Sequence, residues 1–266
     1  MHAQLVATAL STSADRVAVR QSDTDIVEHD TGAFGSTGTV VAGKASHAAA
    51  KELAAVLRKT AAVQLGADLE DCVLGPDGVR SPVGSVSLSQ LHRASEASGA
   101  ALMGHGYWGG TPRSVAFNVH GVRVAVNRRT GELKILQSVQ AADAGVVLNP
   151  MQCRGQVEGG SAQALGAVLY EDVVIDDTGA LTTSVLRSYH IPTFADTPRT
   201  EVYFTTRTDA TGPLGAKSMS ESPFNPVAPA LGNAIRHATG VRMTSLPMAR
   251  DEIYLAMRAA GLTQDA

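Results

Sequence analysis

The sequence predicts a mixed α+β fold in which helices pack on small sheets and hairpins. Segments with helical periodicity, such as residues 151–170, occur alongside segments that alternate like strands, such as residues 115–126. Aromatic residues are only 4% of the chain, whereas glycine occurs 26 times. The core is therefore expected to consist mainly of Ala, Val and Leu, joined by tight turns. We expect one domain over residues 1–266, and a subdivision near residues 110–205 stays open.

The N-terminal part is expected to be helical with one glycine-rich loop. Apolar residues recur with helical spacing over residues 2–10, and residues 16–20 resemble a strand. Residues 30–39 form a Gly/Ser/Thr loop, and an Ala-rich helix follows over residues 46–65. Ser46 is a suitable N-cap for that helix, because its hydroxyl can accept from a free backbone N–H.

The next segment is expected to contain turns and a short helix. Residues 75–86 are predicted to be turns, and a helix over residues 89–97 is expected to end at Gly99. The run 104–110 contains a histidine, a tyrosine and a tryptophan. It suits either an exposed loop or one that lines a pocket.

The middle of the chain carries the clearest strand pattern. Residues 115–126 alternate, residues 128–131 can turn, and residues 133–139 return, which predicts an antiparallel hairpin. Residues 151–170 are predicted to be a helix whose first half carries three glycines. A second hairpin is predicted over residues 173–181.

The last part is expected to be a strand, a loop and two helices. The strand is predicted over residues 201–205, and a loop over residues 211–226 follows. A helix over residues 228–239 is expected to end at Gly240, and a terminal helix runs through Met257.

Composition excludes several classes of function. The formal net charge is −3, and no cluster of Lys or Arg suits a nucleic-acid backbone. Two cysteines, Cys72 and Cys153, are too few for a disulfide framework, an iron–sulfur cluster or a Cys-rich zinc site. Because no apolar run reaches the roughly 20 residues of a membrane helix and no export segment is present, we expect a soluble, cytoplasmic protein.

Three glycine-containing segments are candidate ligand loops. Residues 32–39, 155–166 and 212–221 each lie where a strand or loop meets a helix, where free N–H groups favour anions. None matches the P-loop or the dinucleotide fingerprint. For each segment alone, an ordinary tight turn or close packing is favoured over a site for a phosphate-bearing ligand.

Several motifs together resemble one family. Residues 212–223, Gly-Pro-Leu-Gly-Ala-Lys-Ser-Met-Ser-Glu-Ser-Pro, resemble the glycine-alanine-lysine-to-glutamate loop of the xanthine dehydrogenase and aldehyde oxidase family. Residues 149–166 resemble the family's cofactor-binding helix, and residues 30–39 its glycine-serine loop beside the metal. Residues 189–193 and 230–242 resemble later segments, in the same order. The resemblance implies the C-terminal half of the molybdopterin-binding catalytic domain of a molybdenum hydroxylase.

The resemblance also implies site residues. Glu221 matches the glutamate that takes a proton from the oxygen at the metal, and a partly buried carboxylate suits that task. Gln156 matches the glutamine that contacts the pterin, and Phe34, Gly35 and Ser36 match the loop beside metal and pterin. The pterin's dithiolene holds the metal, so no side chain is expected to ligate it. Without the resemblance, a solvated loop residue is the favoured interpretation of Glu221, and the others suit a turn or a helix end.

Expectations also follow for four residues near these motifs. Ser218 and Ser220 stand where many family members carry glycine, so the loop is expected to be stiffer or shaped for another substrate. Lys217 suits either a salt bridge or a place beside the acidic site. Cys153 is expected to pack as a small apolar residue without chemistry.

The resemblance finally implies cofactors, partners and a reaction. The cofactor would be molybdenum-molybdopterin, as such or as the cytosine dinucleotide, and the enzyme would insert water-derived oxygen at an electrophilic carbon of a purine, N-heterocycle or aldehyde. The motif that grips the pterin precedes the residues matching 2–5, so partner chains would supply the N-terminal half, with 2Fe–2S and FAD modules. The alternatives are a non-catalytic structural remnant and an unrelated phosphate-binding domain.

Overall fold

A computed structural model describes residues 1–21, 23–27, 30, 32–109 and 113–264. The chain groups into two compact units. Unit 1 comprises Met1–Val115 and Thr208–Ser218, and unit 2 comprises Ala116–Arg207 and Met219–Ala266. Helices and small sheets occur in both units, which confirms the predicted α+β class. In the described part of the chain, no helix is both long and apolar enough to cross a membrane.

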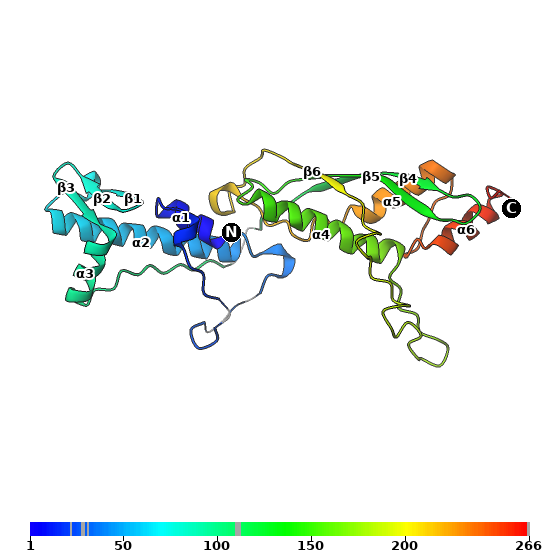
Figure 1. Cartoon of the computed structure of the whole chain (residues 1–266), viewed down its shortest axis with the longest axis horizontal. Coiled ribbons are helices and arrows are strands. Elements are labelled where there is room, and N and C mark those ends of the chain that lie inside the picture. The colour runs from blue at the N-terminus through cyan, green and yellow to red at the C-terminus, as the bar shows by residue number, and fades with distance from the viewer. Residues whose placement is uncertain (22, 28–29, 31, 110–112, 265–266) are drawn as a thin grey trace. The chain divides into compact units, whose positions relative to one another are not determined.

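Two helices form the first part of unit 1. Helix α1 spans His2–Ala9 and packs against α2, which spans Val41–Leu65 (Figure 1). Gly43 permits close packing, because a Cβ at this position would lie 3.1 Å from a methyl carbon of the buried Leu5. Helix α2 ends at Gly66, whose φ of +63° suits a left-handed C-cap.

A small sheet lies at the end of α2 (Figure 1). Strands β1 (Val73–Gly75), β2 (Gly78–Ser81) and β3 (Gly84–Ser87) form an antiparallel meander, so the prediction of turns over residues 75–86 is wrong. Helix α3 (Leu88–Ser98) follows and ends at Gly99, as predicted. The core between these elements comprises Leu57, Ala61, Ala62, Cys72, Val79, Val86 and Leu91.

Two other predictions for unit 1 are wrong. Residues 16–20 form no strand, because only a 3-10 turn over Ala14–Arg16 precedes irregular chain. Helix α2 begins at Val41 and not at Ser46, since Thr37 O accepts from Val41 N–H at 2.7 Å and continues the preceding turn into the helix. The Ser46 hydroxyl instead lies 2.8 Å from Nδ1 of His2.

Unit 2 is organised around one three-stranded sheet. Strands β4 (Asn118–Val126) and β5 (Leu133–Ala142) pair antiparallel, which confirms the first predicted hairpin (Figure 1). Strand β6 (Thr200–Phe204) pairs parallel with β5. The register of the hairpin shifts between Arg123 and Val124. This β-bulge changes which side chains of β5 face inward.

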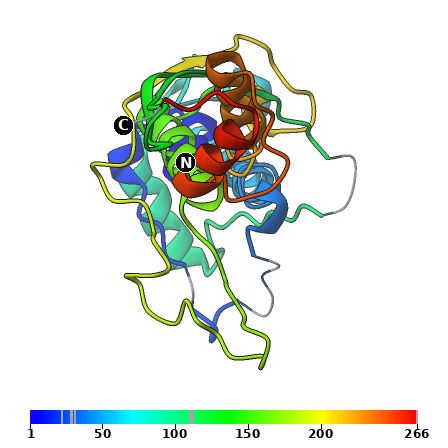
Figure 2. The ribbon, with the colours of Figure 1, turned by 90° about the vertical axis from the view of Figure 1, so that its right-hand side faces the viewer.

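Helices complete unit 2, and Figure 2 shows them in light green, orange and red. Helix α4 spans Pro150–Leu169, and its N-terminus is capped by Asn149, whose Oδ1 accepts from Gln152 N–H at 3.1 Å. Helix α5 spans Val227–Thr239 and packs on β4, and helix α6 spans Arg250–Ala259. The main core joins these helices to the sheet; its buried members are Ala164, Leu165, Val168, Leu169, Val227, Leu231, Ile235, Met243, Met248, Ile253 and Met257.

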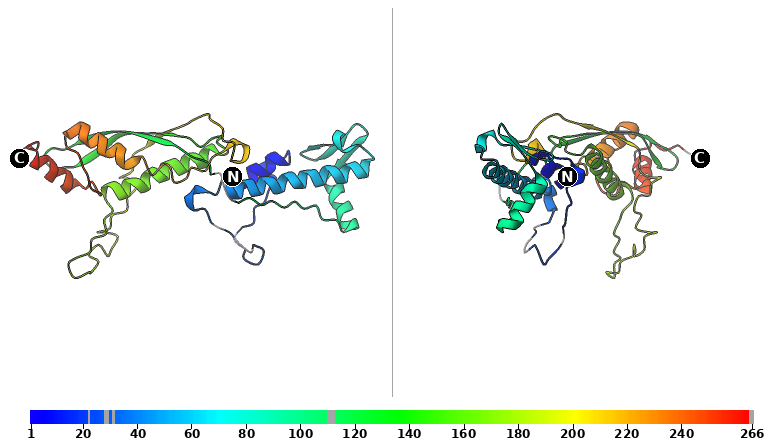
Figure 3. Two further views of the ribbon diagram at one scale, coloured as in Figure 1. Left: turned by 180° about the vertical axis from the view of Figure 1, so that it is seen from behind. Right: turned by 60° about the vertical axis from the view of Figure 1, so that its left-hand side comes forward.

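A long irregular segment connects α4 to β6. Residues 170–199 leave the C-terminal end of α4 and extend away from it as a loop (Figure 3). The predicted hairpin over residues 173–181 is reduced to one isolated bridge between Ile175 and Leu181. Large apolar side chains along this segment are exposed, including Phe194 at 98%.

Candidate functional site

Glu221 lies in the chain of turns that leads into α5. Its side chain is exposed and not partly buried as expected from the sequence, whereas the neighbouring Met219 and Pro223 are buried. Ser222 N–H donates to Met219 O, and Phe224 N–H donates to Glu221 O, each at 3.1 Å. The backbone of Glu221 is therefore held on both sides while the carboxylate stays accessible.

A buried polar network fastens this turn to the sheet. Gln140 of β5 is 0% exposed, and its Nε2 donates to Pro223 O at 2.8 Å and to Ser161 Oγ of α4 at 2.9 Å. Its Oε1 accepts from Asn118 Nδ2 at 3.3 Å, and Asn118 Oδ1 accepts from Ser222 Oγ at 2.9 Å. Sequence reasoning missed Gln140, Asn118 and Ser161, since polar residues in strands and helices usually face solvent.

Helix α4 presents Gln156 and two bare glycines to solvent. Gln156 is exposed, and a Cβ at Gly155 or Gly159 would have nothing within 4 Å. At Gly160, by contrast, a Cβ would lie 3.1 Å from Pro223 Cβ. The three glycines were predicted to permit close approach, and they differ in what lies beside them. The Glu221 turn packs against Gly160, whereas the helix surface at Gly155 and Gly159 is open.

The loop residues that were predicted to lie beside the metal and the pterin belong to unit 1. Phe34, Gly35 and Ser36 form a 3-10 turn within the predicted loop 30–39, of which residue 31 lies outside the described residues. Gly35 and Ser36 both have positive φ, +64° and +59°. Positive φ is strained for serine and is held only where the surroundings require it. Ser36 is buried and Phe34 is 70% exposed.

The five predicted site residues are thus distributed over both units. Phe34, Gly35 and Ser36 belong to unit 1, whereas Gln156 and Glu221 belong to unit 2. The chain passes from unit 1 to unit 2 between Ser218 and Met219, within the motif that carries Glu221.

The first half of that motif belongs to unit 1 and is tightly turned. Asp209 Oδ1 accepts from the N–H groups of Thr211 and Gly212, at 2.7 and 3.0 Å. Ser218 Oγ accepts from Val40 N–H at 3.1 Å, just before α2 begins. Lys217 Nζ donates to a backbone carbonyl, Val115 O, at 3.0 Å. The serine at 218 therefore adds a contact that glycine could not make.

The aromatic run that starts at residue 104 also lies in unit 1; its residue 110 is outside the described part. Lys44 Nζ lies 3.5 Å from the centroid of the Trp108 ring, a cation–π contact. His105 N–H donates to Glu52 Oε2 at 2.9 Å, and Tyr107 is 90% exposed. Two of these three residues therefore contact α2.

A second polar chain lies on the inner face of the sheet in unit 2. His120 Nε2 lies 2.9 Å from Ser138 Oγ, which lies 2.9 Å from Thr200 Oγ1. Burial lowers the pKa of His120 to about 4, and its Nδ1 is buried without a hydrogen-bond partner among the described residues. At neutral pH the imidazole is therefore uncharged.

Neither cysteine is bonded to another, and Cys153 behaves as predicted. It is half-buried beside Ala142, Ala144 and Val157, and burial raises the pKa of its thiol to about 11. Among the described residues, no group of three or more His, Cys, Asp or Glu side chains is placed to hold a metal ion.

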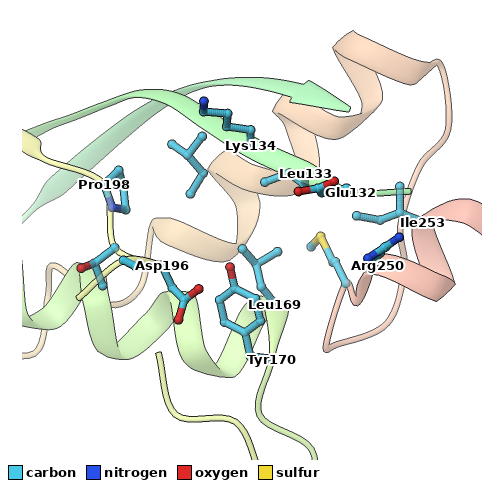
Figure 4. A pocket seen from close by; sticks show the side chains of 13 residues that line it. Glu132, Leu133, Lys134, Leu169, Tyr170, Asp196, Pro198, Arg250 and Ile253 are labelled. Atoms are coloured by element: carbon cyan, nitrogen blue, oxygen red, sulfur yellow. The ribbon is translucent and has the colours of Figure 1, made fainter. Parts of the chain in front are cut away.

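Unit 2 also contains a pocket of about 370 Å³ near the C-terminal end of α4 (Figure 4). Leu169, Tyr170 and Ile253 contribute to its lining, together with Asp196 and Arg250. Asp196 accepts from Thr193 N–H and Oγ1 and lies 3.2 Å from His190 Nε2, contacts that lower its pKa. None of the five predicted site residues lines this pocket.

Comparison with known proteins identifies a family. Residues 1–198 match the model of the molybdopterin cofactor-binding domain. A protein named probable hypoxanthine oxidase from Escherichia coli (strain K12) is 32% identical over 258 residues, which are 96% of this chain and 27% of that protein. The carbon monoxide dehydrogenase large chain of Hydrogenophaga pseudoflava is 26% identical and is matched over 98% of this chain and 34% of its own length.

Solved structures agree with the sequence matches. Quinoline 2-oxidoreductase from Pseudomonas putida 86 superposes with a TM-score of 0.87 at 26% identity, covering 97% of this chain and 34% of that one. The chain therefore spans about a third or less of the length of these relatives.

Proposed function

Because the chain belongs to the molybdopterin cofactor-binding domain family of the molybdenum hydroxylases, we propose that it is part of their catalytic subunit, with Glu221 as the catalytic base. The enzyme inserts water-derived oxygen at an electrophilic carbon. Family membership excludes the alternative of an unrelated phosphate-binding domain.

The observation that carries the proposal is the combination of an exposed carboxylate and a fixed backbone at Glu221. The buried Met219 and Pro223 anchor the turn on both sides, so the carboxylate extends from a defined point. A general base must be held in reach of the proton it removes, and rigid support preserves that geometry. Glu221 thus takes the proton from the attacking oxygen and later releases it to solvent.

The residues on α4 fit a polar, planar cofactor such as a pterin. The exposed amide of Gln156 offers two N–H donors and one acceptor, and the bare surface at Gly155 and Gly159 lets a ring approach the helix backbone. We assign the same function to the turn of Phe34, Gly35 and Ser36. When bound, molybdenum-molybdopterin, as such or as the cytosine dinucleotide, supplies a Lewis acid and a two-electron acceptor.

We further propose that the chain acts in a complex. The proposed partners carry the N-terminal half of the molybdenum domain and the 2Fe–2S and FAD modules. The chain itself spans 27% and 34% of the lengths of two relatives. The exposed Val185, Leu186 and Phe194, at 59%, 73% and 98%, support such a contact, because apolar side chains of this kind are usually covered in an assembly. The unpaired cysteines support a cytoplasmic setting.

The substrate class proposed is a purine, an N-heterocycle or an aldehyde. The relative named probable hypoxanthine oxidase, at 32% identity, favours a purine among these. All three present a planar, electron-poor carbon to an oxygen nucleophile. A comparison of hypoxanthine, quinoline and an aromatic aldehyde as substrates of the native complex tests this ranking.

The proposed function is tested by Glu221→Gln in the native complex. We expect turnover to fall by about 10²-fold or more, the usual contribution of a general base, while molybdenum and pterin per complex stay unchanged. Glu252→Gln is the matched control, because Glu252 is exposed on α6, and it should keep full turnover. Full turnover in Glu221→Gln, or a wild-type complex that contains no molybdenum, would contradict the proposal; the second result would favour the non-catalytic remnant.

A further inference from the structure

Gln140 is a fully buried amide that joins three elements of unit 2. It belongs to β5 and contacts α4 through Ser161 and the Glu221 turn through Pro223. Burial of an amide without partners is costly, so its donors and acceptor must all be used. All of them are used, because the two N–H groups bond to Ser161 and Pro223 and the carbonyl oxygen bonds to Asn118.

The orientation of this amide is fixed by its neighbours. The carbonyl of Pro223 can only accept, so the Gln140 nitrogen must face it. The Ser161 hydroxyl donates to Val157 O at 2.8 Å and is therefore free to accept the second N–H of Gln140. The amide oxygen must then point to the remaining neighbour, Asn118.

The orientation of the Gln140 amide also determines how Asn118 contacts Ser222, the residue beside Glu221. Asn118 donates its Nδ2 to Gln140, so its Oδ1 faces the hydroxyl of Ser222. The single proton of this hydroxyl is shared between Asn118 Oδ1 and Met219 O, each at 2.9 Å. Both residues that follow Glu221 are therefore bound, Ser222 by its side chain and Pro223 by its carbonyl. Both bonds lead back to the amide of Gln140.

We propose that Gln140 is a positioning residue that holds the Glu221 turn against the sheet of unit 2. This inference rests on the proposed function, because Gln140 acts on the reaction only through Glu221. A leucine of similar size would leave the Pro223 carbonyl and the Asn118 amide without their partner. The turn would then sample positions in which the carboxylate is misplaced.

The first test measures hydrogen exchange of the full chain with Gln140→Leu. The amides to follow are those of Ser222 and Phe224, which bond within the turn. We expect both amides to exchange at least about tenfold faster. In the variant, opening of the turn costs less free energy, because the hydrogen bond from Gln140 is already absent. The matched control is Gln137→Leu on the same strand, where the exposed side chain donates to Glu201 at 3.0 Å. It should leave both amides at wild-type rates.

The second test separates positioning from general stability. In the native complex, Gln140→Leu should lower kcat by about tenfold with KM and molybdenum content unchanged, as expected of a misplaced base. Ser222→Ala removes the hydroxyl that contacts Asn118 of the same network and Met219 O of the turn, and it should give the same pattern with a smaller change. Ser222→Ala also replaces Gln140→Leu as the test variant if Gln140→Leu does not fold.

The outcomes distinguish this inference from the proposed function. Wild-type exchange at Ser222 and Phe224 in Gln140→Leu, or at Phe224 in Ser222→Ala if only that variant folds, overturns the inference. A raised KM or lost molybdenum with unchanged kcat also overturns it. Full turnover in Glu221→Gln overturns the proposed function instead, and the exchange rates then decide alone whether Gln140 holds the turn.

Discussion

Gly160 of α4 lies against Pro223, because a Cβ on the glycine would come within 3.1 Å of the proline Cβ. Gly160→Val should therefore push the Glu221 turn away from α4 and lower the free energy of unfolding by about 1–3 kcal/mol, the usual cost of overpacking. Urea unfolding of the chain measures this change. Gly159→Val is the matched control, since nothing lies within 4 Å of a Cβ there. Equal losses in both variants would contradict the prediction.

Gly155 and Gly159 are expected to lower the stability of α4 and to leave space for the cofactor. Alanine at either position should stabilise α4 by about 0.5–1 kcal/mol, because glycine is a poor helix former and the space is open. If the bare surface admits the pterin, each alanine should also lower the molybdenum and pterin content of the native complex. Thermal unfolding and elemental analysis measure the two effects. A stabilised variant with full cofactor content would show that the pterin does not approach these glycines.

His120 predicts a loss of stability in mild acid. Burial lowers its pKa from 6.5 to about 4 in the folded chain, so between these values the unfolded chain binds more protons. The free energy of unfolding should therefore fall as the pH drops from 6.5 towards 4. Urea unfolding at several pH values measures the slope, and His120→Gln should flatten it. His92→Gln, on the exposed side of α3, should not change the slope; an equal slope in both variants would refute the assignment.

The elements that sequence predicted best are those with local signals. Gly99 and Gly240 end α3 and α5 in the left-handed conformation that glycine favours, and Asn149 caps α4. The start of α2 was missed because its N-terminal region is stabilised from a distance, with Ser218 accepting from Val40 N–H. The local sequence of residues 40–46 cannot predict a contact with a residue so far along the chain.

The network behind Glu221 was missed for a related reason. Simple alternation along β5 places Leu133 and Ile135 inward and Gln140 toward solvent. The bulge opposite Arg123 and Val124 reverses this alternation, so that Gln140 is buried. The family resemblance could indicate Glu221, but only the register of the sheet reveals what holds it.

Cys153 should be almost unreactive in the folded chain. Burial raises its pKa from 9.0 to about 11, which at pH 8 reduces the thiolate, the reactive form, by about 100-fold. Alkylation by iodoacetamide, followed by mass spectrometry in a Cys72→Ser background, should therefore be at least about 100-fold slower than for the same thiol in denaturant. The denatured chain is the control, because unfolding removes the burial. Equal rates in both states would mean that this side of α4 is open to solvent, and the packing of Cys153 beside Val157 would then be wrong.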